Sequence, residues 1–344
     1  MNRLAPDPSD ARFIRRVLIV VAIGLVLVAL YRAANILILA FGATLGAIVI
    51  RSLAGLCERH LHLPRRWATV AGMATALAAI LFLVWLFAVQ FGTQVNQFVT
   101  ALPQILQDMR AMIAGSPVGD KVIDAIEDAY AGSKIAHDIG GLVTGSAELL
   151  LNMILVIAGA FFLAADPTAY RRGALRLIPA SSRPAFEDAL ADTTETLRLW
   201  LIAQIILMTS MGTTVGIGLW IAGVPSPAAL GLLAGLSEFI PYVGPTVAMI
   251  PAFGLAATVG PGAVGGTLAT YVVVRLMHTN FITPYVQKRA ISIPPAITLF
   301  AIIGIGMVTG LYGLFFSAAL LVVAFTLVRS LYMREVLGEP RPGA

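Results

Sequence analysis

The residues that could do chemistry inside a membrane lie in the second half of the chain, in segments that are otherwise apolar. In the stretch GLSEFIPYVGP, residues 235–245, Glu238 stands beside two prolines and a glycine, which disfavour a continuous helix. Arg275 and His278 lie three residues apart in a second apolar run, so a helix would place them on one face. A carboxylate in this setting can carry a proton or a cation, and we expect Glu238 to act in such a relay.

The roles of the other two residues are open. Arg275 is either the counter-ion of Glu238 or a group that holds the substrate. His278 titrates near neutral pH and could carry a proton, or it could hydrogen-bond a helix carbonyl. At a rise of about 1.5 Å per residue, Glu238 lies about 16 Å beyond Pro227 and Arg275 about 20 Å before Lys288, near mid-bilayer. Because a charge facing lipid there costs about 2.5–3.5 kcal/mol, both residues are predicted to face a partner or water.

The composition indicates that membrane helices must position these residues. Of the 344 residues, 58% are hydrophobic and 12% are charged, which excludes an ordinary soluble domain. Charge-free runs such as 67–91 and 199–222 are long enough to cross about 30 Å of hydrocarbon as helices. We therefore predict an all-α, polytopic transmembrane protein with about six full spans plus two broken or re-entrant helical hairpins. The predicted spans are 17–30, 36–50, 67–91, 149–165, 199–222 and 263–286.

The positive charges predict the topology. Most of the 23 Lys and Arg residues fall in segments that alternate with poorly charged ones, and we place these basic segments, with both termini, on the cytoplasmic side of the membrane. The segments are 1–16, 51–66, 166–198, 288–289 and 329–341. Because the charges flank apolar runs, the lipid bilayer is the expected partner and nucleic acid is not.

These assignments divide the chain into five parts. They are an N-terminal tail with two short spans and a basic loop (1–66), the third and fourth spans (67–165) flanking an external amphipathic segment (92–148), a cytoplasmic amphipathic helix (166–198), a transport core (199–330), and a cytoplasmic tail (331–344). The external segment is expected to be a solvated cap or an interfacial helix pair, with a ligand-capturing domain as the alternative.

Two proline-led runs in the core have interrupted middles. In residues 225–259 two half-helices are predicted to meet at 240–245, since one straight helix would have to tolerate several internal prolines. Residues 293–328 are interrupted by glycines that we expect to act as hinges or packing sites. These are Gly304, Gly306, Gly310 and Gly313. Non-helical backbone at membrane depth is tolerated only against protein or a water-filled cavity, and such pairs of broken segments point to a transporter site.

Glycines four residues apart are predicted to pack helices closely. The pairs are Gly42/Gly46, Gly212/Gly216, Gly231/Gly235, Gly262/Gly266 and Gly306/Gly310.

Three sequence motifs carry a resemblance to a known family. FIPYVGP at 239–245, NFITPYV at 280–286 and the G-x-x-G spacing at 310–313 are similar to those of the autoinducer-2 exporter family. Positions that match the family motifs are Ile240, Pro241, Tyr242, Gly244, Pro245, Asn280 and Pro284. The chain departs from the family at His278, where a glutamate is usual, and at Ala319, where a proline is expected.

The resemblance implies a multi-pass secondary transporter of the bacterial inner membrane. The expected substrate is a small polar solute such as the autoinducer-2 quorum-sensing signal, moved with H⁺ or Na⁺ by alternating access around the broken helices. The family also implies a homo-oligomer, and we expect a pentamer. A sodium(lithium)/proton antiporter is the first alternative, and a non-transporting membrane scaffold is the second.

Enzymatic classes find no support in the sequence. It has no zinc-binding His-Glu-x-x-His helix, no Gly-x-Ser-x-Gly elbow and no phosphate loop, so no catalytic residue is predicted. Cys57 is the single cysteine, and neither a metal site nor a cofactor is expected.

Overall fold

Helices form all the regular structure that is described for this chain. A computed structural model describes residues 8–91, 141–287 and 293–334, which confirms the predicted all-α class for these ranges. The helices are α1 (Pro8–Leu61), α2 (Arg65–Phe91), α5 (Gly141–Ala165), α6 (Pro167–Arg176), η1 (Ala180–Ser182), α7 (Arg183–Ile221), α8 (Pro227–Ser237), α9 (Val243–Val259), α10 (Pro261–Met277), η2 (His278–Ile282), α11 (Thr283–Gln287), α12 (Pro295–Leu327) and η3 (Val328–Arg334). Most of the predicted external segment, 92–148, lies outside the described residues, as does the basic pair 288–289.

Within the described ranges, 4 helical segments are long and apolar enough to cross a membrane. They are Arg32–Leu61, Arg65–Leu86, Ala180–Ile221 and Pro295–Met333. A helix pair bent by 89°, Leu150–Ala165 with Pro167–Arg176, raises the number to 5. The polytopic class is therefore confirmed, whereas the predicted number of about six full spans is not reproduced.

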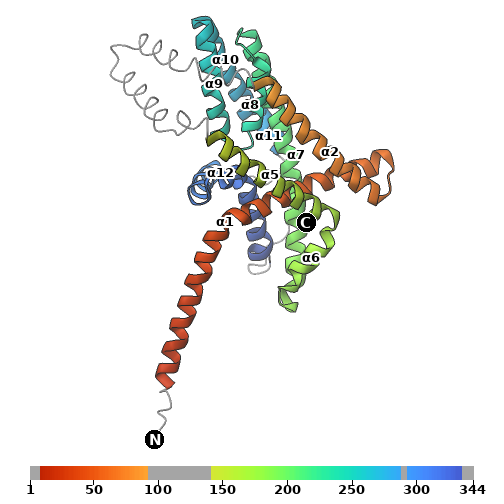
Figure 1. Cartoon of the computed structure of the whole chain (residues 1–344), viewed down its shortest axis with the longest axis vertical. Coiled ribbons are helices and arrows are strands. Elements are labelled where there is room, and N and C mark those ends of the chain that lie inside the picture. The colour runs from red at the N-terminus through yellow and green to blue at the C-terminus, as the bar shows by residue number, and fades with distance from the viewer. Residues whose placement is uncertain (1–7, 92–140, 288–292, 335–344) are drawn as a thin grey trace.

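The turn that we expected between the spans 17–30 and 36–50 is absent. The helix α1 runs without interruption through both, and Figure 1 shows its N-terminal half projecting away from the other helices. The residues between the two runs, Tyr31 to Asn35, include neither glycine nor proline. A polar interruption of this kind does not break a helix, because arginine and alanine are good helix formers.

The amphipathic segment 166–198 is also not a single separate helix. Its first part forms α6, and its second part is the beginning of α7, which continues directly into the predicted span 199–222. Two prolines open these helices, at the first helical positions where proline is favoured.

Helix α7 is the centre of the packing. It contacts α8, α10, α11 and α12 and also reaches α1, whereas α1, α2 and α5 form a second group of helices (Figure 1). One apolar core lies among α7, α8, α9 and α10, a second joins α1, α7 and α12, and a third lies within α1, α2 and α5.

Glycines allow α7 and α8 to approach at backbone distance. A Cβ atom at Gly231 would lie 2.5 Å from the carbonyl oxygen of Gly212 and 2.8 Å from the Cα of Gly216. Gly235 is equally close to α7, with its Cβ position 2.6 Å from the carbonyl oxygen of Met208. The predicted packing role is confirmed for these two glycine pairs, while a side chain at Gly262 would meet nothing within 4 Å.

We predict that Gly231→Ala destabilises the protein, because the added methyl group meets backbone atoms that can move only if α8 separates from α7. Overpacking of this kind costs about 1–3 kcal/mol. The thermal unfolding midpoint of the purified protein in detergent should fall relative to the unmodified chain. Gly265→Ala is the matched control, since Gly265 lies in α10 with nothing within 4 Å of its Cβ position. Equal midpoints for the two variants would contradict the close packing.

Candidate functional site

The first predicted hairpin is present. Helix α8 ends at Ser237 and α9 begins at Val243, with the non-helical Tyr242 at φ 67° and ψ −45°. A Cβ atom at Gly244 would overlap the carbonyl oxygen of Ser237, so the chain reverses direction here and only glycine fits. The break predicted at 240–245 is confirmed, although the helix ends two residues earlier than expected.

The second hairpin is present as well, inside α12. Gly310 has φ 70° and ψ −154°, a conformation that only glycine adopts readily. A Cβ atom at Gly306 would lie 2.9 Å from Cδ1 of Leu314, whereas residues eight apart in a straight helix are separated by about 12 Å. The chain therefore folds back at Gly310. Gly313 is buried beside this break, while Gly304 has open space around it and no hinge geometry.

The two breaks meet in a cluster of aromatic rings. Phe239, in the first break, stacks on Phe315, five residues after the second break, with ring centroids 4.3 Å apart. Trp200 of α7 contacts Phe239 edge to face at 5.9 Å, and Phe316 contacts Phe315 at 4.9 Å. Two segments that are 76 residues apart in the chain are thus held together close to both breaks.

Glu238 lies at the C-terminal end of α8, next to this cluster. Its backbone carbonyl accepts a hydrogen bond of 2.7 Å from Nε2 of Gln204, a buried residue of α7. Its carboxylate atom Oε2 is buried and has no hydrogen-bond partner among the described residues. Because a helix C-terminus carries partial negative charge, a buried carboxylate there is stabilised by taking up a proton or a cation.

Arg275 does not form an ion pair with Glu238, which was one of the two roles expected for it. Within the described ranges no ion pair joins the two side chains. The guanidinium of Arg275 instead lies over the ring of Tyr242, 5.9 Å from its centroid, in a cation–π contact.

His278 begins a π-helical turn that interrupts the helix between α10 and α11. Its ring is buried, with Nε2 3.3 Å from Oγ of Ser210 on α7. The other ring nitrogen, Nδ1, is buried and makes no hydrogen bond in the described part of the chain, so the expected alternative of a bond to a helix carbonyl is not observed. Isolated π-helical turns are frequent at functional sites.

Two family-matched residues lie apart from this group. Asn280 donates a hydrogen bond of 2.9 Å from Nδ2 to the carbonyl of Leu276, and its side chain is exposed. Pro284 is exposed in α11. By contrast, Pro245 is buried and Pro241 is half-buried in the first hairpin. The structure thus brings together the first motif but not the second.

Sequence reasoning missed three polar residues that support the breaks. Gln204 and Ser210 of α7 contact Glu238 and His278, and Asn152 of α5 donates a hydrogen bond of 2.8 Å to the hydroxyl of Tyr312. Each is a polar side chain inside an otherwise apolar run, which is the signal that would have identified it.

The chemistry available here is the binding of small ions and polar groups. The described residues contain no group of three or more His, Cys, Asp and Glu side chains that could hold a metal ion. What they offer is one unpaired carboxylate, one guanidinium on an aromatic ring and one imidazole with a free nitrogen. Such groups can exchange a proton or a monovalent cation and can bind the oxygens of a polar solute.

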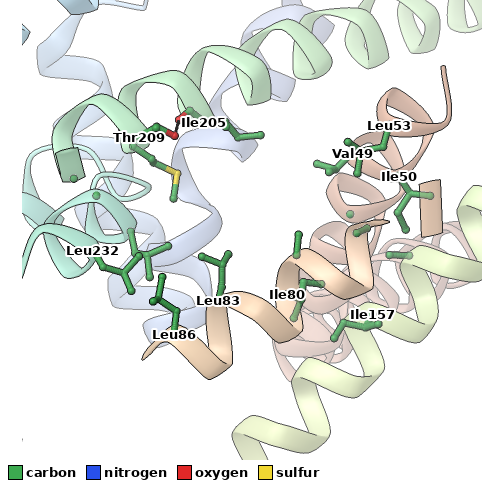
Figure 2. A pocket seen from close by; sticks show the side chains of 18 of the residues that line it. Val49, Ile50, Leu53, Ile80, Leu83, Leu86, Ile157, Ile205, Thr209 and Leu232 are labelled. Carbon is green, nitrogen blue, oxygen red and sulfur yellow. Dashed lines mark hydrogen bonds between the residues drawn. The ribbon is translucent and has the colours of Figure 1, made fainter. Parts of the chain in front are cut away.

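An apolar cavity lies beside the first hairpin. It has a volume of about 760 Å³ and separates α1, α2 and α5 from α7 and α8, as Figure 2 shows. Of the described residues that line it, only Thr209 and Thr213 have polar side chains, and their hydroxyl groups donate to carbonyls of their own helix. The cavity is therefore unsuited to holding a polar solute, and the polar groups at the breaks are the better candidate site.

The chain is similar in sequence to several known proteins. The Bacillus subtilis (strain 168) protein named "Putative transport protein YrrI" is 27% identical over 220 residues, covering 62% of this chain and 61% of that protein. "Putative transport protein YueF" of the same organism is 24% identical over 196 residues, covering 57% and 51%. "Putative transport protein MT0215" of Mycobacterium tuberculosis (strain CDC 1551 / Oshkosh) is 26% identical over 270 residues, covering 73% of each.

The match thus spans less than two thirds of the length of the two Bacillus proteins. A family model gives a longer match. The model described as "AI-2E family transporter" matches residues 17–333, which include both hairpins and the polar groups around them. The chain belongs to the AI-2E transporter family.

Proposed function

We propose that this protein is a secondary membrane transporter for a small polar solute, such as the autoinducer-2 signal, and that transport is coupled to protons or sodium ions. The main support is the meeting of the two broken segments at the Phe239–Phe315 stack, next to the unpaired carboxylate of Glu238. Broken helices that meet near the middle of a membrane are the usual setting of transporter sites.

The groups at the breaks have distinct roles in this proposal. Glu238 binds the coupling proton or cation, which removes the unpaired negative charge at the end of α8. Arg275, oriented by the ring of Tyr242, binds oxygen atoms of the solute. His278 passes a proton through Ser210, toward which its Nε2 points.

The two hairpins provide the moving parts. Gly310 and the segment 238–242 allow backbone torsions that a helix does not, so each half-helix can pivot about its break. In the proposed alternating-access cycle, the half-helices open the site to one side of the membrane at a time. We also propose that the protein forms homo-oligomers, with a pentamer as the expected assembly.

The first alternative function is a sodium(lithium)/proton antiporter. The unpaired carboxylate of Glu238 favours it, since a buried acid alone can exchange a proton for a cation. The second alternative is a scaffold that transports nothing, and measurements of solute and ion transport test it.

We predict that Glu238→Gln uncouples transport. Glutamine has a similar shape but cannot take up a proton or carry the charge, so a pH gradient should no longer drive solute movement. Uptake of autoinducer-2 into everted vesicles should fall by about tenfold under a pH gradient, the range expected when coupling between two sites is lost. Glu187→Gln, at an exposed ion pair with Arg171, is the control and should transport normally.

Measurements in the same everted vesicles distinguish the alternative functions. Release of a proton gradient on addition of Na⁺ or Li⁺ without autoinducer-2 identifies the antiporter. No movement of autoinducer-2, Na⁺, Li⁺ or H⁺ by the unmodified protein would reject transport of these solutes and leave the scaffold.

We predict that Gly310→Ala strongly reduces transport. A side chain at φ 70° and ψ −154° costs about 1–3 kcal/mol of backbone strain, and the variant relieves that strain by straightening the hairpin. Gly304→Ala is the control, because Gly304 has equally open space but ordinary helical torsions. The proposal predicts slow autoinducer-2 uptake for Gly310→Ala only, and equal rates in both variants count against a hinge at Gly310.

The proposed orientation predicts which sites react from outside the cell. In a Cys57→Ala background, a cysteine replacing Gly262 should be labelled in intact cells by a membrane-impermeant maleimide. A cysteine replacing Arg172 should be labelled only after the cells are opened. Both positions are surface-accessible in the structure. The reverse pattern would invert the proposed orientation and place the basic segment 166–198 outside the cell.

A further inference from the structure

A second pocket lies where α1, α5, α6 and α7 come together, at some distance in the chain from the hairpins. It has a volume of about 540 Å³. Arg51 and Arg59 of α1 and Arg198 of α7 line it. The apolar lining comes mainly from Ala47, Ile48, Leu56, Leu163, Pro167 and Tyr170. The pocket therefore has a strongly basic part and an apolar part.

The positive charge in this pocket is mostly uncompensated. Among the described residues, no aspartate or glutamate lines it. Arg51 donates one hydrogen bond of 3.2 Å to Thr69, and Arg198 contacts Glu195 at 3.3 Å, which leaves most of the five donors of each guanidinium free. Arg59 has no hydrogen bond or ion pair within the described ranges. A ligand that supplies several anionic oxygens would satisfy all three arginines.

The aliphatic hydroxyl groups of the pocket are already used. The hydroxyl groups of Thr44, Ser52 and Thr194 each donate to a carbonyl four residues earlier in their own helix, at 3.0, 2.8 and 2.8 Å. These groups therefore do not compete for the ligand as donors, and the guanidinium groups remain the main donors. Arginine binds phosphate oxygens in a bidentate manner better than any other side chain.

We propose that this pocket binds an anionic phospholipid, with its phosphate at Arg51, Arg59 and Arg198 and the start of an acyl chain against the apolar lining. The volume is within the range of about 300–1,000 Å³ that is usual for small-molecule sites. Leu56 and Tyr170 are half exposed at the pocket, so an acyl chain can leave it along apolar surface. Basic pockets between membrane helices are known to hold anionic lipid headgroups.

A phospholipid fits this pocket better than a soluble phosphate ester does. A soluble ester would leave the apolar lining uncovered, whereas a lipid covers both parts. A zwitterionic lipid would bring its own cation to the three arginines, which disfavours it. The binding itself does not depend on the proposed transport function.

Binding can be measured by native mass spectrometry of the purified full chain in detergent, with three probes. Dioctanoyl phosphatidylglycerol has the anionic phosphate and chains, dioctanoyl phosphatidylcholine has the same chains with a neutral headgroup, and glycerol 3-phosphate has the phosphate without chains. We expect phosphatidylglycerol to bind at least about fivefold more tightly than either of the others. Equal binding of phosphatidylcholine overturns the charge argument, and equal binding of glycerol 3-phosphate overturns the lipid assignment.

Variants connect the binding to this pocket. Each arginine near a membrane surface contributes about fivefold to the affinity for an anionic lipid, so Arg51→Gln, Arg59→Gln and Arg198→Gln combined should weaken phosphatidylglycerol binding by about 100-fold. Arg66→Gln is the control, since Arg66 is exposed in the same basic segment but does not line the pocket. Unchanged binding in the triple variant overturns the proposal.

Arg59→Gln alone decides the question if the triple variant does not fold. Because Arg59 has no polar partner within the described ranges, its replacement leaves the hydrogen bonds of those residues intact. We expect an unchanged thermal midpoint without lipid and about fivefold weaker binding of phosphatidylglycerol. Wild-type affinity in this variant rejects the site.

Discussion

The structure depends on one constraint, which is that backbone groups released from a helix at membrane depth must find partners inside the protein. In the first hairpin, the amides of Glu238, Phe239 and Ile240 donate to carbonyls in the last turn of α8, at 3.2 to 3.3 Å for the first two and 3.0 Å for Ile240. The carbonyl of Glu238 needs a donor from elsewhere, and Gln204 of α7 provides it at 2.7 Å. The break is therefore stable only where α7 is very close.

That closeness requires glycine on both helices. Side chains at Gly212 and Gly231 would separate α7 from α8, and the amide of Gln204 would then no longer reach the break. The same helix also carries Ser210 to His278. Packing between small residues in one part of α7 thus determines whether polar contacts in another part can form, since a helix moves largely as a rigid body.

The second hairpin is held from two sides. The stack of Phe239 on Phe315 attaches it to the first hairpin, and the bond from Asn152 to Tyr312 attaches it to α5. However, an apolar cavity lies between α5 and the core helices α7 and α8. Thr209 and Thr213 line this cavity, but their hydroxyl groups donate to carbonyls within α7 and not across the cavity. Few directional contacts oppose a relative movement of the two helix groups there, which is compatible with the alternating access that we propose.

The amino-acid sequence by itself determined the all-α membrane class, the position of the first break and the glycine-rich stretch 304–313 within which the second break lies. These features follow from local causes: apolar runs of sufficient length, the missing amide of proline, and the backbone freedom of glycine. Which of the four glycines takes the non-helical torsion, Gly310, was seen only in the structure. The sequence did not predict that α1 is one continuous helix, because Arg32 permits a turn without requiring one. Only the tertiary structure decided that Arg275 lies on Tyr242 and forms no ion pair with Glu238. Which side chains meet depends on how α10 is rotated against the hairpin, and that rotation results from packing over the whole interface, which no local pattern contains.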